Sequence, residues 1–348
     1  MEREYNSGGI IFAPTNIERY RSSVPNPTQQ ASALTRGYMI ALVSAVILST
    51  TAIFIRYLTQ TYALPALVLA CWRDFMVVLT LLLVLGIFRP ALLKAGRRHL
   101  PYLAGYGLVL ALFNSTWTLA VTLDGAAVAT VLAYTSGAFT ALLGWWLLKE
   151  RLDAVKLGEV ALSLAGCVLV AGALDPAVWS ANPWGILTGV FSGLMYAVYS
   201  LMGRSASQRG LDPWTTLLYT FGVAAVVLLV VNLVPGGPLP GSAARPSDFL
   251  WLGGSLAGWG VLFLLAAGPT LLGYGLYNVS LTYLPSSVAN LIVTLEPAFT
   301  TVIAYFVLSE RLDALQLLGS ALILAGVFIL RVHEGRQPGL PLAPAAAD

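Results

Sequence analysis

The chain has 348 residues, a formal net charge of +3 at pH 7 and a mean hydropathy of +0.79. Charged residues are 10% of the sequence and hydrophobic residues 57%, whereas an average soluble domain contains about 25% charged residues. This composition excludes a pair of soluble domains and indicates an all-α polytopic membrane protein.

The first 35 residues are polar and include Pro14, Pro25 and Pro27. They lack the apolar core of a signal peptide, so we expect a disordered tail. Ten apolar segments follow, each of about 19–25 residues and therefore long enough to cross the hydrocarbon core of a bilayer. The sequence predicts transmembrane helices at approximately 37–58, 65–88, 101–122, 126–148, 154–173, 184–204, 213–234, 261–283, 286–308 and 313–331.

The segment between the seventh and eighth predicted helices, Pro235–Trp259, fits this pattern least well. It begins with glycines and prolines and ends in a mildly apolar stretch, Phe249–Gly258. Proline and glycine interrupt helices. We therefore predict a long loop here, with a short helix at the membrane interface.

A repeated motif indicates how the ten segments are organised. Glu310-Arg311-Leu312-Asp313 follows the same four residue types, Glu150 to Asp153, at an offset of 160 residues. The first helices of the two halves match at a smaller offset of 148, and the difference is an insertion in the loop after the seventh helix. Each half thus has five helices, and because five is odd, the second half is expected to enter the membrane upside down.

The repeat defines the predicted domains. We expect a disordered cytoplasmic tail at 1–35, a first repeat at 36–175, a second repeat at 176–333 and a C-terminal cytoplasmic tail at 334–348. If the N-terminus is inside, 15 of the 19 Lys and Arg residues fall on the cytoplasmic side. By the positive-inside rule, the sequence predicts ten spans in the plasma (inner) membrane with both termini cytoplasmic.

Several short motifs resemble those of a known family. They are Trp72-Arg73, Leu295-Glu296-Pro297 and Glu310-Arg311-Leu312, with Lys149–Leu152 in the first copy and glycines at 158, 166, 319 and 326. With these motifs, nearly all of Arg36–Arg331 resembles the EamA-type branch of the drug/metabolite transporter superfamily.

The resemblance implies ten helices, a central cavity between the halves and export of small metabolites. Exporters of amino acids, including aromatic ones, belong to this branch. The first copy departs from the pattern, because Ser136-Gly137 stands where the second has Glu296-Pro297. Any role of that acid is therefore not duplicated.

Few ionisable residues lie within the predicted spans, and such residues usually face a cavity or a partner. Arg73 and Glu296 are candidate substrate-binding charges, and the alternative for each is a structural contact between helices. For Glu296 the structural role is slightly favoured over substrate binding, because Pro297 suggests a deformed helix held by a local polar contact. Asp74 is adjacent in sequence to Arg73 and does not share its helix face, so the two need not pair. Glu159, near the end of its span, is expected to be solvated.

Polar and aromatic side chains form stripes at helical spacing. Asn114, Trp117 and Thr118 share one helix face, and the offset of 160 places Tyr274, Tyr277 and Asn278 at the equivalent positions. Symmetry-related stripes are what a shared cavity wall would need, and the alternative is hydrogen bonding between packed helices. Weaker sets contain Tyr196 and Tyr199 on the sixth helix and Tyr134 on the fourth.

These features favour a secondary transporter of small molecules that works in the lipid bilayer, with no cofactor, metal or nucleic acid. We expect no enzyme, since His99 and His333 lie outside the spans and no nucleotide-binding motif occurs. Alternatives are a carrier for another metabolite or drug-like solute and, more distantly, a channel or membrane enzyme. Because Arg73 is the one basic residue in the interior of a predicted span, neutral and aromatic amino acids are the predicted substrates rather than phosphorylated compounds.

Overall fold

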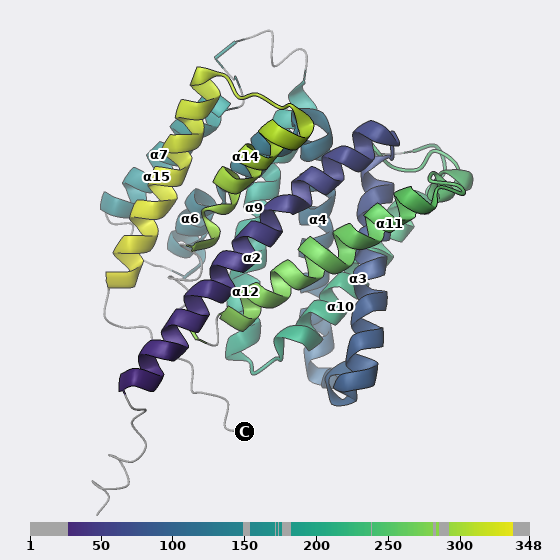
Figure 1. Cartoon of the computed structure of the whole chain (residues 1–348), viewed down its shortest axis with the longest axis horizontal. Coiled ribbons are helices and arrows are strands. Elements are labelled where there is room, and N and C mark those ends of the chain that lie inside the picture. The colour runs from purple at the N-terminus through teal and green to yellow at the C-terminus, as the bar shows by residue number, and fades with distance from the viewer. Residues whose placement is uncertain are drawn as a thin grey trace, which may run out of the picture.

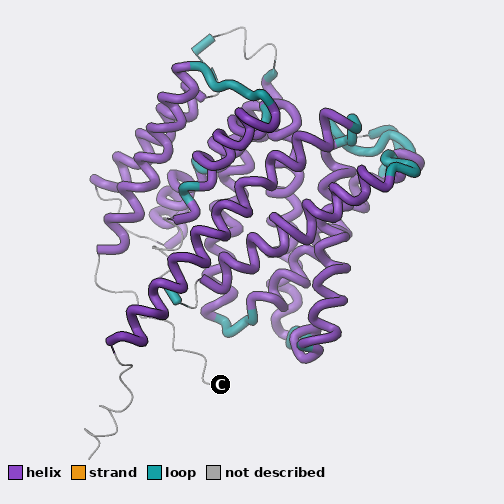
Figure 2. Tube along the Cα trace, in the orientation of Figure 1, coloured by secondary structure: helices purple, strands orange, loops and turns teal. Residues whose placement is uncertain are grey.

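A computed structural model describes residues 27–148, 154–170, 182–237, 239–280 and 292–336, together with residues 172, 174, 175, 283 and 284. The regular structure of these residues is helical throughout (Figures 1 and 2). Each of the ten predicted spans contains a helix. The first half holds α2 (Pro27–Thr61), α3 (Ala66–Phe88), α4 (Leu100–Asp124), α5 (Ala126–Ala133), α6 (Ser136–Leu148) and α7 (Ala154–Val170).

The second half holds α9 (Pro183–Gln208), α10 (Pro213–Leu233), α11 (Leu256–Leu265), the π-helix η4 (Ala266–Gly273), α12 (Tyr274–Ser280), α14 (Glu296–Leu308) and α15 (Ala314–Arg336). Within the described residues, seven helical segments are long and apolar enough to cross a bilayer, and α14 and α15 are shorter apolar helices. The structure is thus that of an all-α membrane protein built as a bundle of ten helical segments.

The first helix begins earlier than the sequence predicted. α2 starts at Pro27, inside the stretch 1–35 that was expected to be disordered. Proline suits the first position of a helix, and the Gln, Ala and Leu residues that follow it are good helix formers. The rest of the predicted tail, residues 1–26, lies outside the described residues.

The loop after α10 packs against the first half. Gly241 accepts a hydrogen bond from the backbone nitrogen of Leu67 (2.8 Å), and Trp72 donates its indole N–H to the carbonyl of Phe249 (2.7 Å). The segment Pro235–Trp259 contains a short helix, as predicted, because a 3-10 helix covers Pro246–Leu250. Ser255 caps α11 by accepting from the backbone nitrogen of Gly258, so the eighth span starts at Leu256 rather than 261.

The last helices of the two halves, α7 and α15, lie side by side (Figure 1). A Cβ added at Gly166 would lie 2.5 Å from the carbonyl oxygen of Gly319, and one added at Gly326 would lie 3.3 Å from the carbonyl oxygen of Glu159. The residue number of the contact falls on α15 as it rises on α7, so the two helices are antiparallel. The offset of 160 converts each of these contacts into the other, so the repeat read from the sequence is also present in the packing.

Two helices are broken at equivalent places in the two halves. The break between α5 and α6 falls at Tyr134 and Thr135, and the turn before α14 falls at Thr294 and Leu295. The offset of 160 relates the two breaks. A third irregularity is η4, which contains Pro269 and therefore cannot keep regular α-helical hydrogen bonds. Residues in or next to all three irregular segments, Tyr134, Thr270 and Glu296, line one cavity.

An ion pair joins the two halves where α4 turns into α5, which we call the Gly125 end of the bundle. Glu310, between α14 and α15, accepts hydrogen bonds from the backbone nitrogens of Ala126 (3.0 Å) and Ala127 (3.3 Å). Its Oε1 atom lies 3.2 Å from Nε of Arg56 on α2, and Arg56 donates to two carbonyl oxygens near the end of α4. The acid thus faces the positive end of α5 and the base faces the negative end of α4.

Candidate functional site

A cavity lies in the middle of the bundle, where the irregular segments meet. Side chains from both halves line it: Leu48, Thr51, Arg73, Phe113, Asn114, Trp117, Thr130, Ala133, Tyr134, Tyr196, Thr270, Tyr274 and Glu296. Its volume of about 40 Å³ has room for a few water molecules. A larger solute therefore needs the walls to move apart before it can enter.

Stacked rings form one wall of the cavity. Phe113 lies 5.2 Å from Tyr196 and 6.2 Å from Trp117, measured between ring centroids, with interplanar angles of 23° and 19°. Phe113 and Trp117 are four residues apart on α4 and therefore share a face, while Tyr196 comes from α9. Rings arranged in this way offer a planar apolar surface to a ligand.

A buried polar cluster lies beside this wall. Arg73 is 1% exposed and its Nε lies 3.2 Å from Oδ1 of Asp74. Asp74, 0% exposed, also accepts hydrogen bonds from the side-chain nitrogen of Asn114 at 2.9 and 2.8 Å. The sequence interpretation that Arg73 and Asp74 need not pair is therefore wrong. The long guanidinium side chain folds back to its neighbour, because in this apolar bundle a buried charge needs a partner.

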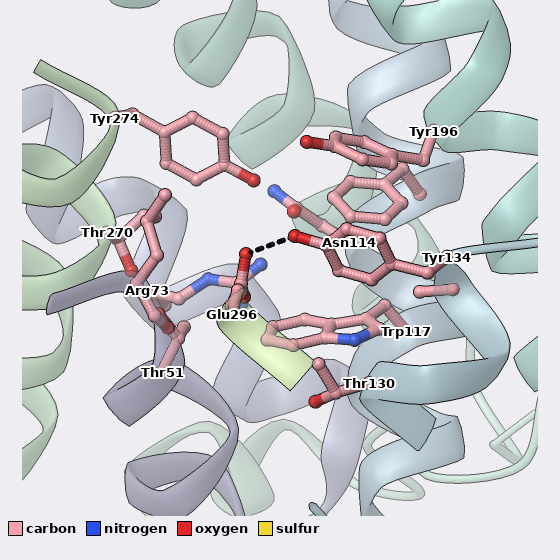
Figure 3. A pocket seen from close by; sticks show the side chains of 13 residues that line it. Thr51, Arg73, Asn114, Trp117, Thr130, Tyr134, Tyr196, Thr270, Tyr274 and Glu296 are labelled. Atoms are coloured by element: carbon pink, nitrogen blue, oxygen red, sulfur yellow. Dashed lines mark hydrogen bonds between the residues drawn. The ribbon is translucent and has the colours of Figure 1, made fainter. Parts of the chain in front are cut away.

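Glu296 joins the two helix breaks across the cavity. The hydroxyl of Tyr134 donates to Oε2 of Glu296 (2.9 Å) and lies 2.7 Å from the carbonyl oxygen of Val293. The predicted helix deformation held by a polar contact at Glu296 and Pro297 is present, and the partner comes from the other half. Figure 3 shows the rings of Trp117, Tyr134 and Tyr196 facing Arg73 and Tyr274, with Glu296 between them.

Seven of the eleven predicted site residues line the cavity: Arg73, Asn114, Trp117, Tyr134, Tyr196, Tyr274 and Glu296. Tyr199 lies further along α9 and packs against Tyr106, with ring centroids 4.8 Å apart and ring planes tilted by 39°. Tyr277 packs against apolar clusters around Leu48 and Ala41, about one helical turn beyond the cavity. Thr118 is fully buried outside the lining, and Asn278 is half-buried outside it.

The sequence interpretation missed six lining residues: Leu48, Thr51, Phe113, Thr130, Ala133 and Thr270. Threonines, alanines and leucines are common in transmembrane helices, so residue type gave no signal for most of them. The repeat did carry a signal for two of them. At the offset of 148, Leu48 and Thr51 are the counterparts of Tyr196 and Tyr199, so the candidates on α9 pointed to equivalent positions on α2.

Glu159 also differs from expectation, since it is 1% exposed rather than solvated. Its Oε1 accepts a hydrogen bond from the hydroxyl of Ser163 (3.0 Å), and a Cβ added at Gly137 would lie 2.7 Å from that oxygen. Packing of α6 and α15 on α7 covers it. Among the described residues, no three His, Cys, Asp or Glu side chains gather as metal ligands would.

The family model for the EamA-like transporter family matches residues 35–172 and 183–332. An uncharacterized transporter of Archaeoglobus fulgidus is 29% identical over 226 residues, which cover 64% of this chain and 74% of that protein. An uncharacterized transporter of Clostridium kluyveri is 25% identical over 300 residues, covering 84% and 92%.

A solved structure described as "Crystal structure of protein" aligns with a TM-score of 0.55 and 18% identity. The alignment covers 87% of this chain and 99% of that one, and at this identity it shows the fold alone. Two matched repeats, the helical bundle and the transporter relatives agree with one another. The chain belongs to the EamA-like transporter family and is a multi-pass membrane transporter, not an enzyme.

Proposed function

We propose that this transporter exports small metabolites, chiefly neutral and aromatic amino acids, through the central cavity. One observation carries the proposal: the stacked rings of Phe113, Trp117 and Tyr196 face a polar wall that holds Arg73. Rings suit an apolar or aromatic side chain, and the polar wall suits the charged groups of an amino acid.

The chemistry of the wall also disfavours other solutes of this size. A phosphorylated metabolite needs several basic side chains around its charge, and Arg73 is the one basic residue among those that line the cavity. Amide and hydroxyl groups, from Asn114, Thr51 and Thr270, orient a polar head without adding charge. A zwitterion with a planar or small apolar side chain therefore fits best.

We infer that transport proceeds by alternating access between two inverted five-helix repeats. The antiparallel contact of α7 with α15 supports inversion. Discontinuous helices at the cavity are typical of carriers that rock around a central site, and Tyr134 and Glu296 connect two such helices. The small volume of the cavity, about 40 Å³, is consistent with a contracted state from which the halves must separate.

Transport into proteoliposomes tests the function. With radiolabelled amino acids, uptake should saturate and should be stimulated by the same amino acid on the far side, which separates a carrier from a channel. Trp117→Ala should lower the affinity for phenylalanine and tryptophan about two- to tenfold. It should change the affinity for alanine or threonine little, because a small side chain does not reach the ring wall.

Trp145→Ala is the matched control, because Trp145 is 51% exposed on α6 and lies outside the cavity lining. It should leave the substrate preference unchanged. Equal loss of all substrates in Trp117→Ala would assign this ring to helix packing. Tight competition by a phosphorylated metabolite would show that the proposed substrate class is wrong.

A further inference from the structure

The guanidinium of Arg73 has a nitrogen that the protein leaves without a hydrogen-bond partner. Arg73 is 1% exposed, and its Nε is engaged by Asp74. Its Nη2 atom is buried and makes no hydrogen bond, although it carries two N–H donors. A buried donor without an acceptor costs free energy, and the cost is greater for a charged group.

Asp74 contacts this guanidinium at Nε and makes no hydrogen bond with the free Nη2 atom. Its Oδ1 receives Arg73 Nε at 3.2 Å, and both of its oxygens accept from the side-chain nitrogen of Asn114. The three side chains come from α3 and α4, and Arg73 and Asn114 both line the cavity. Arg73 is thus held by one edge, and the remaining donors are available to a ligand.

The scaffold does not require a cation at this position. At the offset of 148, the counterpart of Arg73 is Phe221 on α10, which is also 1% exposed. A phenylalanine therefore occupies the equivalent buried position in the other half. The two halves therefore differ at this position, and the half that carries the charge places it at the cavity, where a single substrate has to be oriented.

We propose that Nη2 of Arg73 is a carboxylate-binding subsite, and that the substrate is recognised by its carboxylate rather than by its amine. This rests on the proposed function, since it takes the cavity to be the transport site. A carboxylate matches the guanidinium in charge and geometry. The body of the substrate then lies along the rings of Phe113, Trp117 and Tyr196. A monocarboxylate with a planar apolar body is the minimal ligand.

Two analogues of phenylalanine separate the two anchors. Phenylpropionate keeps the carboxylate and lacks the amine, whereas phenylethylamine keeps the amine and lacks the carboxylate. In proteoliposomes, phenylpropionate should inhibit phenylalanine transport at concentrations within about tenfold of phenylalanine itself, and phenylethylamine should be at least about a hundredfold weaker. The opposite order would overturn the proposal and would make Glu296 the anchor, with the transport function intact.

Variants of Arg73 provide the second arm. Arg73→Gln should remove the preference for phenylpropionate, and Arg73→Lys, which keeps the charge but loses the planar fork, should weaken it about tenfold. Arg97→Gln, at an exposed position before α4, is the matched control and should behave as the original protein does. An unchanged preference in either folded Arg73 variant would overturn the proposal.

Ligand-induced thermal stabilisation of the purified full-length protein keeps this test independent of transport. Phenylpropionate should raise the unfolding temperature of the original protein and of Arg97→Gln, but not that of Arg73→Gln. If phenylpropionate stabilises the protein while no amino acid is transported, the proposed function fails and the carboxylate subsite stands. If amino acids are transported but phenylpropionate neither binds nor competes, the subsite fails and the function stands.

Discussion

A single carboxylate does for α5 what a capping side chain does for most helices. α5 begins with Ala126 and Ala127 after the N-cap residue Gly125, and none of the three has a side chain able to accept a backbone hydrogen bond. Glu310 accepts from two of those backbone nitrogens instead. A cap of this kind is worth about 1 kcal/mol to a helix, and the negative charge adds a favourable interaction with the helix dipole.

Gly125→Ala is expected to disturb this cap. Gly125 has a φ of +90°, and a Cβ there would lie 2.9 Å from Oε1 of Glu310. Strain of this kind costs about 1–3 kcal/mol, so unfolding of the purified protein should occur at lower temperature. Gly222→Ala on α10, where an added Cβ meets nothing within 4 Å, is the control. Equal stability of the two variants would show that the turn tolerates a side chain.

Burial of individual charges was the least predictable property of the sequence. Glu159 lies near the start of α7, and this closeness to the end of the helix suggested contact with solvent. It is buried because α15 covers it, and the identity of the neighbouring helix is not contained in local sequence. The pairing of Arg73 with Asp74 was missed for a related reason. Assigning residues to helix faces assumes that each side chain points straight out from the helix axis, whereas arginine is long enough to fold back to its neighbour.

At the scale of helices, the sequence predicted the number of segments and the repeat because both depend on hydrophobic length and on an ungapped motif. It predicted the deformation at Glu296 because Pro297 cannot donate the next hydrogen bond. The matching break at Tyr134 has no proline to mark it, and only the offset of 160 would have revealed it. Helix starts shifted where a cap such as Ser255 decides the boundary.

The contact of α7 with α15 depends on glycines, which gives a prediction for the helix pair. A Cβ added at Gly166 would lie 2.5 Å from the carbonyl oxygen of Gly319 and 2.6 Å from Ile323. Gly166→Ala should therefore push the helices apart and destabilise the protein by about 1–3 kcal/mol. Gly158→Ala, on the same helix but with nothing within 4 Å of the added atom, should not. Thermal unfolding in detergent measures both, and a stable Gly166→Ala protein would contradict the close packing.

For the whole molecule, the placement of basic residues predicts which end faces the cytoplasm. Cysteines introduced singly at Gln60 and Gly96, both exposed, probe opposite ends of the bundle after Cys71 and Cys167 have been replaced by serine. In intact cells, an impermeant thiol reagent should label the cysteine at position 60 and not the one at 96. Labelling at 96 alone would reverse the proposed orientation.

Alternating access also requires the Gly125 end to open. Asn182, just before α9, donates a hydrogen bond to Asp124 at the end of α4 (2.6 Å), so paired cysteines at these positions should form a disulfide between the two halves. In the background without Cys71 and Cys167, oxidation should abolish transport and a reductant should restore it. The Asp124→Cys single variant is the control. Full transport with the disulfide formed would rule out rocking about the central cavity.

The cap on α5 also affects the order in which the protein is made. Glu310 lies 184 residues after Ala126, and ribosomes add about 5–20 residues per second, so α5 emerges roughly 10–40 seconds before its cap exists. Arg56 is synthesised even earlier than Ala126, so the delay before its ion pair with Glu310 can form is longer still. The first repeat therefore enters the bilayer with an unfinished turn, and the fold at the Gly125 end closes only when one of the last segments has been synthesised. Truncation before residue 310 should leave a nascent chain whose α4–α5 turn is open to cellular quality control.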